Sequence, residues 1–363
     1  MVSSTSTRIV SRAPARVCLF GDHQDYLGLP IIACAIDRYI DLTATPNNKK
    51  VFNIRMPDIK AVRKLPIDDP LDDLLPGDFL RTALKVCRRY GCKPTSGFDV
   101  FISGNVPVNA GLSSSTALTI SWIQFLIRAF GAAQALSPLF LAQLAYETEV
   151  LEQGASGGKM DQYSIGFGQL IYLAPENDYM ESFELSPGPL VVGVSGIAKD
   201  TEGLLAHLKN GALTAVEQVR HHIPDFQLSQ AGTDSLDTLL PMVATAYQDY
   251  LRAAVGNHEI TQAARKILQQ HTPDLDKLAV LMNRHHALLR DCLKITVPRI
   301  DAMVTAALSA GANAAKIVGS GGGGCVVAMT DAHCEARVIA AIKAAGAVDA
   351  FSVLPAAGAQ CLS

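Results

Sequence analysis

The chain has 363 residues, 49% of them hydrophobic, and its 31 basic and 34 acidic side chains leave a formal net charge of −3, which suits two domains with a sizeable buried core. The basic residues are scattered, which argues against nucleic acid as a partner, and no apolar stretch has the ~20 residues of a membrane span or the form of a signal peptide. The eight cysteines lack the spacing of a metal site and predict reduced, mostly buried thiols in a cytoplasmic protein.

A polar loop follows the first predicted strands. Residues 8–20 alternate in hydrophobicity and predict a strand pair that is broken near Pro14. The loop at residues 21–30 then holds three ionisable side chains between glycines: Asp22, His23 and Asp25. Such loops commonly present groups that contact a ligand, and the alternative is an Asx-type turn in which the two aspartates bond their own backbone.

The next predicted elements are a buried strand at residues 31–37 and a surface hairpin and loop at residues 47–76, where Pro, Asp, Asn and Lys cluster without periodicity. Residues 79–90 then predict an amphipathic helix, which Gly91 and Pro94 bring to an end.

Glycine and hydroxyl residues gather at residues 104–117, between a predicted strand at residues 97–103 and an apolar helix that begins at Ala117. At such a junction, free backbone N–H groups and the positive end of the helix dipole point outward together, so they form an anion site. Serine hydroxyls add donors for phosphate oxygens and a hard oxygen ligand for Mg²⁺. No Gly-Lys-Ser/Thr follows the glycine, so this is not a Walker A loop, and the alternative is a Ser-rich N-cap on a core helix.

Two acidic residues complete the first half. A helix predicted over residues 138–153 places Glu149 on the shoulder of its apolar stripe, either as a salt-bridge partner at the rim or as a group aimed into a cleft. Gly157 and Gly158 free the backbone just before Asp161, which is either a turn residue or a catalytic base.

The domain boundary is predicted within residues 175–189, where Pro, Gly, Asn and acidic residues gather, and it gives domains at residues 1–185 and 186–363. The second half is predicted to begin with a strand at residues 190–194 and to be mostly helical. Helices are predicted at residues 202–222, 235–255, 259–270, 275–294 and 297–308.

Glycines gather again at residues 319–324, between two β-like segments. Gly319, Gly321 and Gly324 formally match G-x-G-x-x-G, but a second β-like segment follows instead of a helix, which argues against a dinucleotide-binding unit. A glycine run between strands either lets the backbone approach phosphates closely or forms a tight hairpin.

Together these segments resemble the GHMP kinase superfamily, which includes galactokinases and mevalonate kinases. Its three motifs occur in the family's order at residues 14–23, 107–115 and 316–325, and residues 282–301 look like the family's C-terminal domain. The resemblance covers nearly the whole chain. It implies an α+β fold of two domains, a ribosomal-S5-like N-terminal domain and a ferredoxin-like C-terminal domain, with the active site between them.

The resemblance also implies roles for single residues. Asp161 resembles the catalytic aspartate of galactokinases, and Arg16 resembles the arginine that accompanies it. Ser115 and Glu149 resemble the family's Mg²⁺ ligands. The implied acceptor-binding residues are Asp22, His23, Asp25 and Tyr26. The implied nucleotide-binding residues are Pro107, Asn109, Ala110, Gly111, Leu112, Ser113, Ser114, Ser115, Gly319, Gly321 and Gly322.

The resemblance implies a reaction in which ATP phosphorylates an alcohol or an anomeric hydroxyl, with a carboxylate that orients the hydroxyl or accepts its proton. Asp25 favours a sugar as acceptor, because mevalonate kinases have an apolar residue there and a buried carboxylate pairs well with two sugar hydroxyls. Asp22 is one methylene shorter than the glutamate of galactokinases, so galactose, another aldose, a uronic acid or a heptose all fit this pattern. One alternative is a mevalonate-type kinase, because Phe20, Gly28 and Pro30 match the first motif of mevalonate kinases. The other is a catalytically silent sensor of sugar and ATP.

Overall fold

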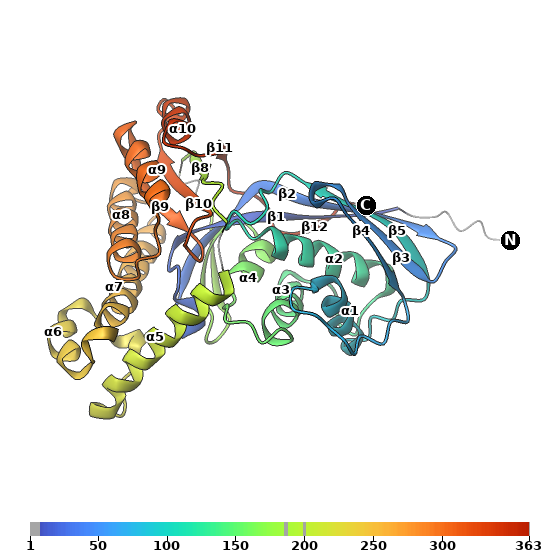
Figure 1. Cartoon of the computed structure of the whole chain (residues 1–363), viewed down its shortest axis with the longest axis horizontal. Coiled ribbons are helices and arrows are strands. Elements are labelled where there is room, and N and C mark those ends of the chain that lie inside the picture. The colour runs from blue at the N-terminus through green and yellow to red at the C-terminus, as the bar shows by residue number, and fades with distance from the viewer. Residues whose placement is uncertain (1–7, 185–187, 199–200, 363) are drawn as a thin grey trace.

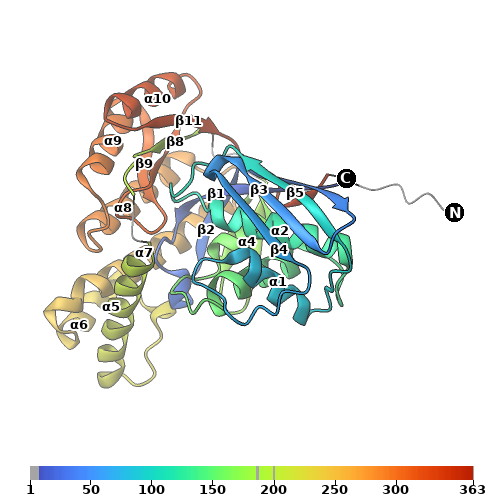
Figure 2. The same ribbon diagram turned by 45° about the vertical axis from the view of Figure 1, so that its right-hand side comes forward.

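The computed structural model describes residues 8–184, 188–198 and 201–362, and its two α+β domains lie side by side (Figures 1 and 2). The predicted boundary between residues 185 and 186 and the polar start at residues 1–7 lie outside the described residues. Among the described residues, no helix combines the length and the apolar character needed to cross a bilayer.

The first domain is built on a sheet that has eight strands in the described part of the chain, in the order β12-β1-β2-β5-β3-β4, with β6 beside β2 and β7 beside β6. Neighbouring strands are antiparallel, except that β3 and β5 are parallel. The strands are β1 Ile9–Phe20, β2 Ile31–Asn47, β3 Val51–Met56, β4 Ala61–Pro66, β5 Gly97–Gly104, β6 Leu170–Ala174, β7 Tyr179–Phe183 and β12 Gln360–Cys361. The strand β12 follows the second domain in sequence, so the chain returns to the first sheet after that domain.

Strand β1 is continuous, so the predicted break near Pro14 is wrong. Its ladder with β2 shifts register between Pro14 and Ala15 and then resumes. An irregularity of this kind tolerates a proline, which cannot donate to the ladder, and it redirects the side chains that follow. Arg16 is the second residue after the shift, and its side chain lines the cavity described below.

Helices cover one face of the first sheet (Figure 1): α1 Phe79–Arg89, α2 Ser114–Phe130, α3 Pro138–Tyr146 and α4 Met160–Phe167. Trp122 of α2 is fully buried and packs against Phe52 and Phe125, while its indole Nε1 donates to the carbonyl oxygen of Leu80 at 3.0 Å. Burying an aromatic side chain contributes ~1.5–3 kcal/mol relative to exposure. The helix that begins at the Ser-rich loop is therefore anchored at its middle.

The second domain contains an antiparallel sheet in the order β11-β8-β10-β9, with β8 Leu190–Val194, β9 Ala312–Val318, β10 Cys325–Thr330 and β11 Asp349–Val353. The helices around it are α5 Thr201–His222, α6 Leu236–Leu239, α7 Thr245–Leu268, α8 Leu275–Asp291, α9 Pro298–Ser309 and α10 Glu335–Ala344. A strand, helices, two hairpin strands, a helix and a last strand make up the ferredoxin-like arrangement that the resemblance implied.

Two separate helices were predicted at residues 235–255 and 259–270, and this division is wrong. The chain turns at Pro241, and α7 then runs without a break through Gly256. A Cβ atom on Gly256 would lie 2.8 Å from the Cδ1 atom of Leu288 on α8. Glycine therefore stands in the middle of α7 because α8 packs closely against it, not because the helix ends there.

The two domains share an apolar core, in which β1, β2 and β6 of the first domain pack against β8, β10, α7 and α8 of the second. Its fully buried members include Val17, Cys34, Val192, Met282 and Val327. The loops at the ends of these elements are consequently held in place by both domains.

Candidate active site

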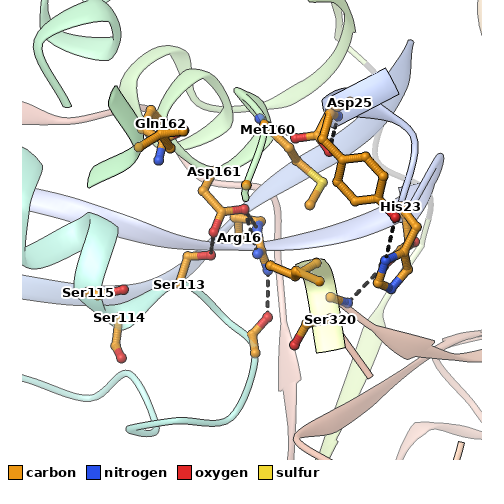
Figure 3. Close-up of a pocket in the computed structure, with 18 of the residues that line it drawn as sticks. Arg16, His23, Asp25, Ser113, Ser114, Ser115, Met160, Asp161, Gln162 and Ser320 are labelled. Atoms are coloured by element: carbon orange, nitrogen blue, oxygen red, sulfur yellow. Dashed lines mark hydrogen bonds and ion pairs between the residues drawn. The ribbon is translucent and has the colours of Figure 1, made fainter. Parts of the chain in front are cut away.

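A cavity of about 220 Å³ lies where the two domains meet (Figure 3). Its walls come from the loop after β1, the Ser-rich loop before α2, the start of α4, helix α5 and the Gly-rich hairpin between β9 and β10. The predicted site residues that line it are Arg16, Asp22, His23, Asp25, Tyr26, Asn109, Gly111, Ser113, Ser114, Ser115, Asp161 and Gly319. The two loops expected to share one ligand therefore open onto the same space.

Other predicted site residues do not line this cavity: Pro107, Ala110, Leu112, Glu149, Gly321 and Gly322. Ala110 and Leu112 are buried beneath the Ser-rich loop. The backbone N–H of Gly322 donates to the carbonyl oxygen of Ile295 at 2.7 Å, and a Cβ atom on Gly321 would lie 2.5 Å from the Cβ atom of Ile295. These two glycines thus serve the close packing of the hairpin within its own domain.

Arg16 and Asp161 form an ion pair at the centre of the cavity (Figure 3). The Nε and Nη2 atoms of Arg16 donate to Oδ1 of Asp161 at 2.8 and 2.6 Å, and the hydroxyl of Ser113 donates to Oδ2. The Nη1 atom of Arg16 donates to the carbonyl oxygen of Gly111 at 2.6 Å. One buried guanidinium therefore joins the carboxylate of α4 to the Ser-rich loop.

Asp161 is the second residue of α4, so it lies in a helix rather than in a turn. A negative charge is favourable in the first turn of a helix, because the helix dipole is positive there. The side chain of Asp161 is 30% exposed, whereas that of Arg16 is 5% exposed. Arg16 and Ser113 thus hold the two oxygens of the carboxylate, and its exposed part opens to the cavity.

The Ser-rich loop has the backbone geometry of an anion site. Its φ angle is positive at alternate residues, Asn109 (55°), Gly111 (82°) and Ser113 (61°), immediately before α2 begins at Ser114. Alternation between right- and left-handed backbone turns successive N–H groups towards one point, and the helix dipole adds to the attraction. Because φ > 0 costs energy at Asn109 and Ser113, the loop keeps strain of the kind found at binding sites.

Asp25 lies beside the glycine pair that precedes α4. Its Oδ2 atom accepts from the backbone N–H of Met160 at 3.0 Å, and its Oδ1 atom accepts from the N–H of Tyr26 at 3.0 Å. A Cβ atom on Gly158 would lie 2.2 Å from Oδ2, so glycine is required there. Burial raises the pKa of Asp25 to about 6, and the nearby charge of Asp161 acts in the same direction. The residue is neither free nor in a simple Asx turn, because Met160 is far away in the sequence.

Asp22 faces the second domain. Its Oδ2 atom accepts from Nζ of Lys316 at 2.6 Å, and its Oδ1 atom accepts from the backbone N–H of Gly319 at 2.8 Å. Nζ of Lys316 also donates to the carbonyl oxygen of Cys18 at 3.0 Å. The pKa of Asp22 falls to about 2, because the charge of Lys316 outweighs the opposing effect of burial. Both oxygens of the carboxylate are engaged in joining the loop after β1 to the Gly-rich hairpin.

Glu149 lies in a π-helical turn, Glu147–Leu151, that continues α3. Its carboxylate accepts hydrogen bonds from Thr116 at 2.8 Å, Thr119 at 2.9 Å and Gln162 at 2.8 Å. The side chain is buried behind the Ser-rich loop, and burial raises its pKa to about 7. Glu149 is thus a buried acid that no described basic side chain neutralises, on the kind of helix bulge that is frequent at functional sites.

Several cavity residues were absent from the predicted set: Val150, Gly157, Gly158, Met160, Gln162, Leu205 and Ser320. The glycine pair was noticed in the sequence, but its contact with Asp25 depends on a loop more than a hundred residues earlier. Leu205 lies on α5, in a helix without any motif, so no signal in the sequence pointed to it.

Three family models match the chain. The GHMP kinases N terminal domain matches residues 78–169, the GHMP kinases C terminal domain matches residues 262–348, and the Galactokinase galactose-binding signature matches residues 3–46. The last of these spans β1 and the loop that carries Asp22 and Asp25.

Relatives of two kinds are similar over most of the sequence. A mevalonate kinase of Thermococcus onnurineus is 31% identical over 350 residues, which are 93% of this chain and 94% of that protein. A galactokinase of Glaesserella parasuis is 26% identical over 336 residues, which are 87% of this chain and 84% of that protein.

Solved structures show the same fold. The Lactococcus lactis galactokinase complexed with galactose superimposes with a TM-score of 0.86 at 22% identity, over 99% of this chain and 97% of that one. The Methanococcus jannaschii mevalonate kinase superimposes with a TM-score of 0.74 at 20% identity, over 97% of this chain and 99% of that one. The predicted α+β architecture of two domains is confirmed.

Proposed function

The chain belongs to the GHMP kinases, which use ATP to phosphorylate hydroxyl groups, and we propose that its acceptor is a monosaccharide phosphorylated at the anomeric hydroxyl. The observation that carries this proposal is the position of Asp25. Its carboxylate stands in the wall of the cavity that also contains Arg16 and Asp161. A buried carboxylate at that position suits an acceptor with several hydroxyl groups and disfavours an apolar one.

In this proposal Asp161 orients the attacking hydroxyl and accepts its proton. Arg16 donates two hydrogen bonds to one oxygen and Ser113 donates to the other, which fixes the orientation of the carboxylate. Phosphoryl transfer depends mainly on positioning and on neutralising oxygen charge, and the guanidinium between Asp161 and Gly111 lies where it can do both. The proton moves from the acceptor oxygen to Asp161 as the new P–O bond forms and the bond between the γ-phosphorus and the β,γ-bridging oxygen breaks, with ADP as the leaving group.

The Ser-rich loop would hold the phosphates of ATP. Ser114 and Ser115 line the cavity on one side, and Gly319 and Ser320 line it from the other domain; Figure 3 shows the three serines. Since the loop has no P-loop lysine, Arg16 is the basic residue of this cavity that would balance part of the triphosphate charge.

Ser115 and Glu149 would hold Mg²⁺ together with phosphate oxygens and water, as is usual for this ion. Among the described residues, no three His, Cys, Asp or Glu side chains form a metal site, which agrees with an ion held largely by its nucleotide. Glu149 fits as a donor, because its carboxylate is buried near the start of α2 without a basic partner and a divalent cation would supply that charge. When bound, the ion would neutralise charge on the transferred phosphoryl group.

Two likenesses support the sugar acceptor. The galactose-binding signature matches the segment that contains Asp22, His23, Asp25 and Tyr26, and the TM-score is high for a galactokinase with bound galactose. Asp25 uses one lone pair on each oxygen for a backbone N–H, which leaves further acceptor capacity for two sugar hydroxyls.

A mevalonate-type kinase is the second candidate, because a mevalonate kinase is 31% identical over nearly the whole chain. Its acceptor carries a primary hydroxyl, a tertiary hydroxyl with a methyl group on the same carbon, and a terminal carboxylate, so it would bring fewer hydroxyl groups to Asp25 than a sugar does. The raised pKa of Asp25, about 6, leaves this carboxylate ionised near neutral pH, where a methyl group is a poor neighbour.

The test is an assay of ADP release with Mg²⁺ and ATP across galactose, arabinose, galacturonate, a heptose and mevalonate. We expect turnover with a sugar, a sugar 1-phosphate as the product by phosphorus NMR, and loss of turnover in D161N. Turnover with mevalonate and with no sugar would replace the proposal by the second candidate. Binding of sugar and ATP without any ADP would indicate a sensor.

A further inference from the structure

A second cavity, of about 530 Å³, adjoins the first on the acceptor side. Its other walls are helix α5, the turn after β6 and the segment around Leu228. Both cavities are lined by the same four residues of the acceptor loop and the glycine pair: Asp25, Tyr26, Gly157 and Gly158. The two cavities therefore lie against the same four residues.

The two cavities differ in their charged residues. Three carboxylates line the first, Asp22, Asp25 and Asp161, of which Asp22 is paired with Lys316 and Asp161 with Arg16. Three basic side chains line the second, Lys159, Lys209 and Arg220, and they face Glu176 and the shared Asp25. The side chain of Asp25 lines both cavities, and the basic side chains lie on the far side of it from Arg16 and Asp161.

Two of these basic groups have no acidic partner in the described part of the chain. Lys159 pairs with Asp178 at 2.6 Å, but no described carboxylate lies within 4.0 Å of the nitrogen atoms of Lys209 or Arg220. The Nζ atom of Lys209 lies 3.5 Å from the carbonyl oxygen of Ser156 and 6.0 Å from the centre of the Tyr26 ring. A half-buried ammonium held against an aromatic ring and without a counter-ion is a ready site for an anion.

We propose that the acceptor sugar carries a carboxylate or a phosphate at the end away from the phosphorylated hydroxyl, and that Lys209 binds this group in the second cavity. The inference rests on the sugar kinase activity proposed above. Asp25 would repel an anion beside it, so the neutral hydroxyls lie next to Asp25 and the charged group lies beyond it. Lys209 is thereby a specificity-determining residue rather than a catalytic one.

Calorimetric titration of the nucleotide-free protein tests this without any turnover. The probes are galactose, galacturonate and galactose 6-phosphate, which differ at the end remote from the anomeric carbon. We expect at least one of the two anionic sugars to bind ~10-fold or more tightly than galactose, and this advantage to shrink as salt is raised. If galacturonate binds more tightly than galactose 6-phosphate, the group recognised is a carboxylate. If galactose 6-phosphate binds more tightly, it is a phosphate.

The variant K209M should reduce this advantage at least ~5-fold, since an ion pair in a half-buried site contributes more than one on the surface. The matched control is K266M, which removes an exposed lysine from α7. K266M should leave the ratio of the two dissociation constants unchanged. A general loss of structure in K209M would weaken all three probes alike, whereas loss of the anion site changes the ratio.

Equal dissociation constants for galactose and both anionic sugars, or an unchanged ratio in K209M, would overturn the inference. Inorganic phosphate that binds with undiminished affinity when galactose is saturating, and is lost in K209M, would indicate a separate anion site and would also overturn it. A chain that phosphorylates galactose without preference for either anion contradicts this inference alone. A chain that phosphorylates mevalonate and binds no sugar contradicts the proposed function as well.

Discussion

Two ion pairs, each between an aspartate and a basic side chain, lie near the domain junction. They differ in how far their side chains are exposed to the cavity. Arg16 and Asp161 approach to 2.6 Å with side chains that are 5% and 30% exposed. Lys316 and Asp22 also approach to 2.6 Å, but their side chains are 0% and 1% exposed. The first pair leaves an acid open to a reactant, while the second joins two domains out of reach of solvent.

Residues of one motif loop therefore differ in what they contact: one binds the other domain, and one lines the cavity. Asp22 and Asp25 are three residues apart, yet Asp22 is engaged by Lys316 and Gly319, while Asp25 faces the acceptor side of the cavity. Asp22 was expected to contact the acceptor. Its side chain is only 1% exposed and is bound by Lys316 and Gly319, an arrangement that suits the different role of fixing the acceptor loop against the Gly-rich hairpin.

The largest effect is expected from breaking the buried ion pair between Lys316 and Asp22. K316M leaves the buried carboxylate of Asp22 without its cation, which should lower the free energy of unfolding by ~3–5 kcal/mol. Urea unfolding at pH 7 measures this change. The control is K343M, which removes the lysine of an exposed pair with Asp349 and should cost less than ~1 kcal/mol. Normal stability of K316M together with lost turnover would place the Lys316 pair in the chemistry instead.

The next largest effect is expected at the partly exposed ion pair between Arg16 and Asp161. D161N keeps the shape of the side chain but cannot accept the proton, so turnover should fall at least ~10²-fold with little change in the affinity for ATP. Steady-state kinetics and a nucleotide titration measure both quantities. D41N is the control, because Asp41 also pairs with an arginine of β1, Arg12, but on the surface. Near-normal turnover of D161N would remove this residue from the mechanism.

A smaller effect should separate the two aspartates of the acceptor loop. D25A should raise the KM for the sugar by ~10-fold, because hydrogen bonds to a charged group contribute ~1.5–3 kcal/mol, and should change the KM for ATP much less. Kinetics with each substrate varied in turn measure the two constants. A larger change in the KM for ATP would assign the loop to the nucleotide.

The smallest effect is a pH dependence of stability. The pKa values of Asp25 and Glu149 rise from 3.8 and 4.5 to about 6 and about 7, so the folded state keeps protons that the unfolded state releases. The resulting stabilisation is fully present below pH ~4 and is lost as the pH rises through 6 and 7. Urea unfolding between pH 5 and pH 8 should therefore show a weaker decline in E149Q than in the unaltered chain. Equal slopes would contradict the raised pKa of Glu149.

The sequence predicted the part of the site that lies in short motifs. The strand, Ser-rich loop and helix at residues 97–130 are local features, and the resemblance supplied the pairing of Arg16 with Asp161. The partner of Asp22 could not be read from the pattern, because Lys316 is 294 residues away and reaches it only through the packing of two sheets. The second cavity depends on α5, whose basic residues follow no motif.

The same limit explains the errors in the fold. Pro14 and Gly256 are breakers by composition, yet a strand and a helix continue through them. In each case the reason is a neighbour in space, the ladder with β2 for Pro14 and the contact with Leu288 for Gly256. The local preferences of proline and glycine predicted an interruption at each position. In the structure a neighbouring strand or helix accommodates the residue, and the strand or helix continues through it.

The pairing of β12 with β1 has a consequence for synthesis. Gln360 and Cys361 lie opposite Arg12 and Ser11, so they cover an edge of the strand that also carries Arg16. A ribosome adds these two residues after every other strand of the first sheet. During most of translation that edge of β1 is therefore unpaired, and a nascent or truncated chain exposes a template for aggregation at the strand that leads into the catalytic centre.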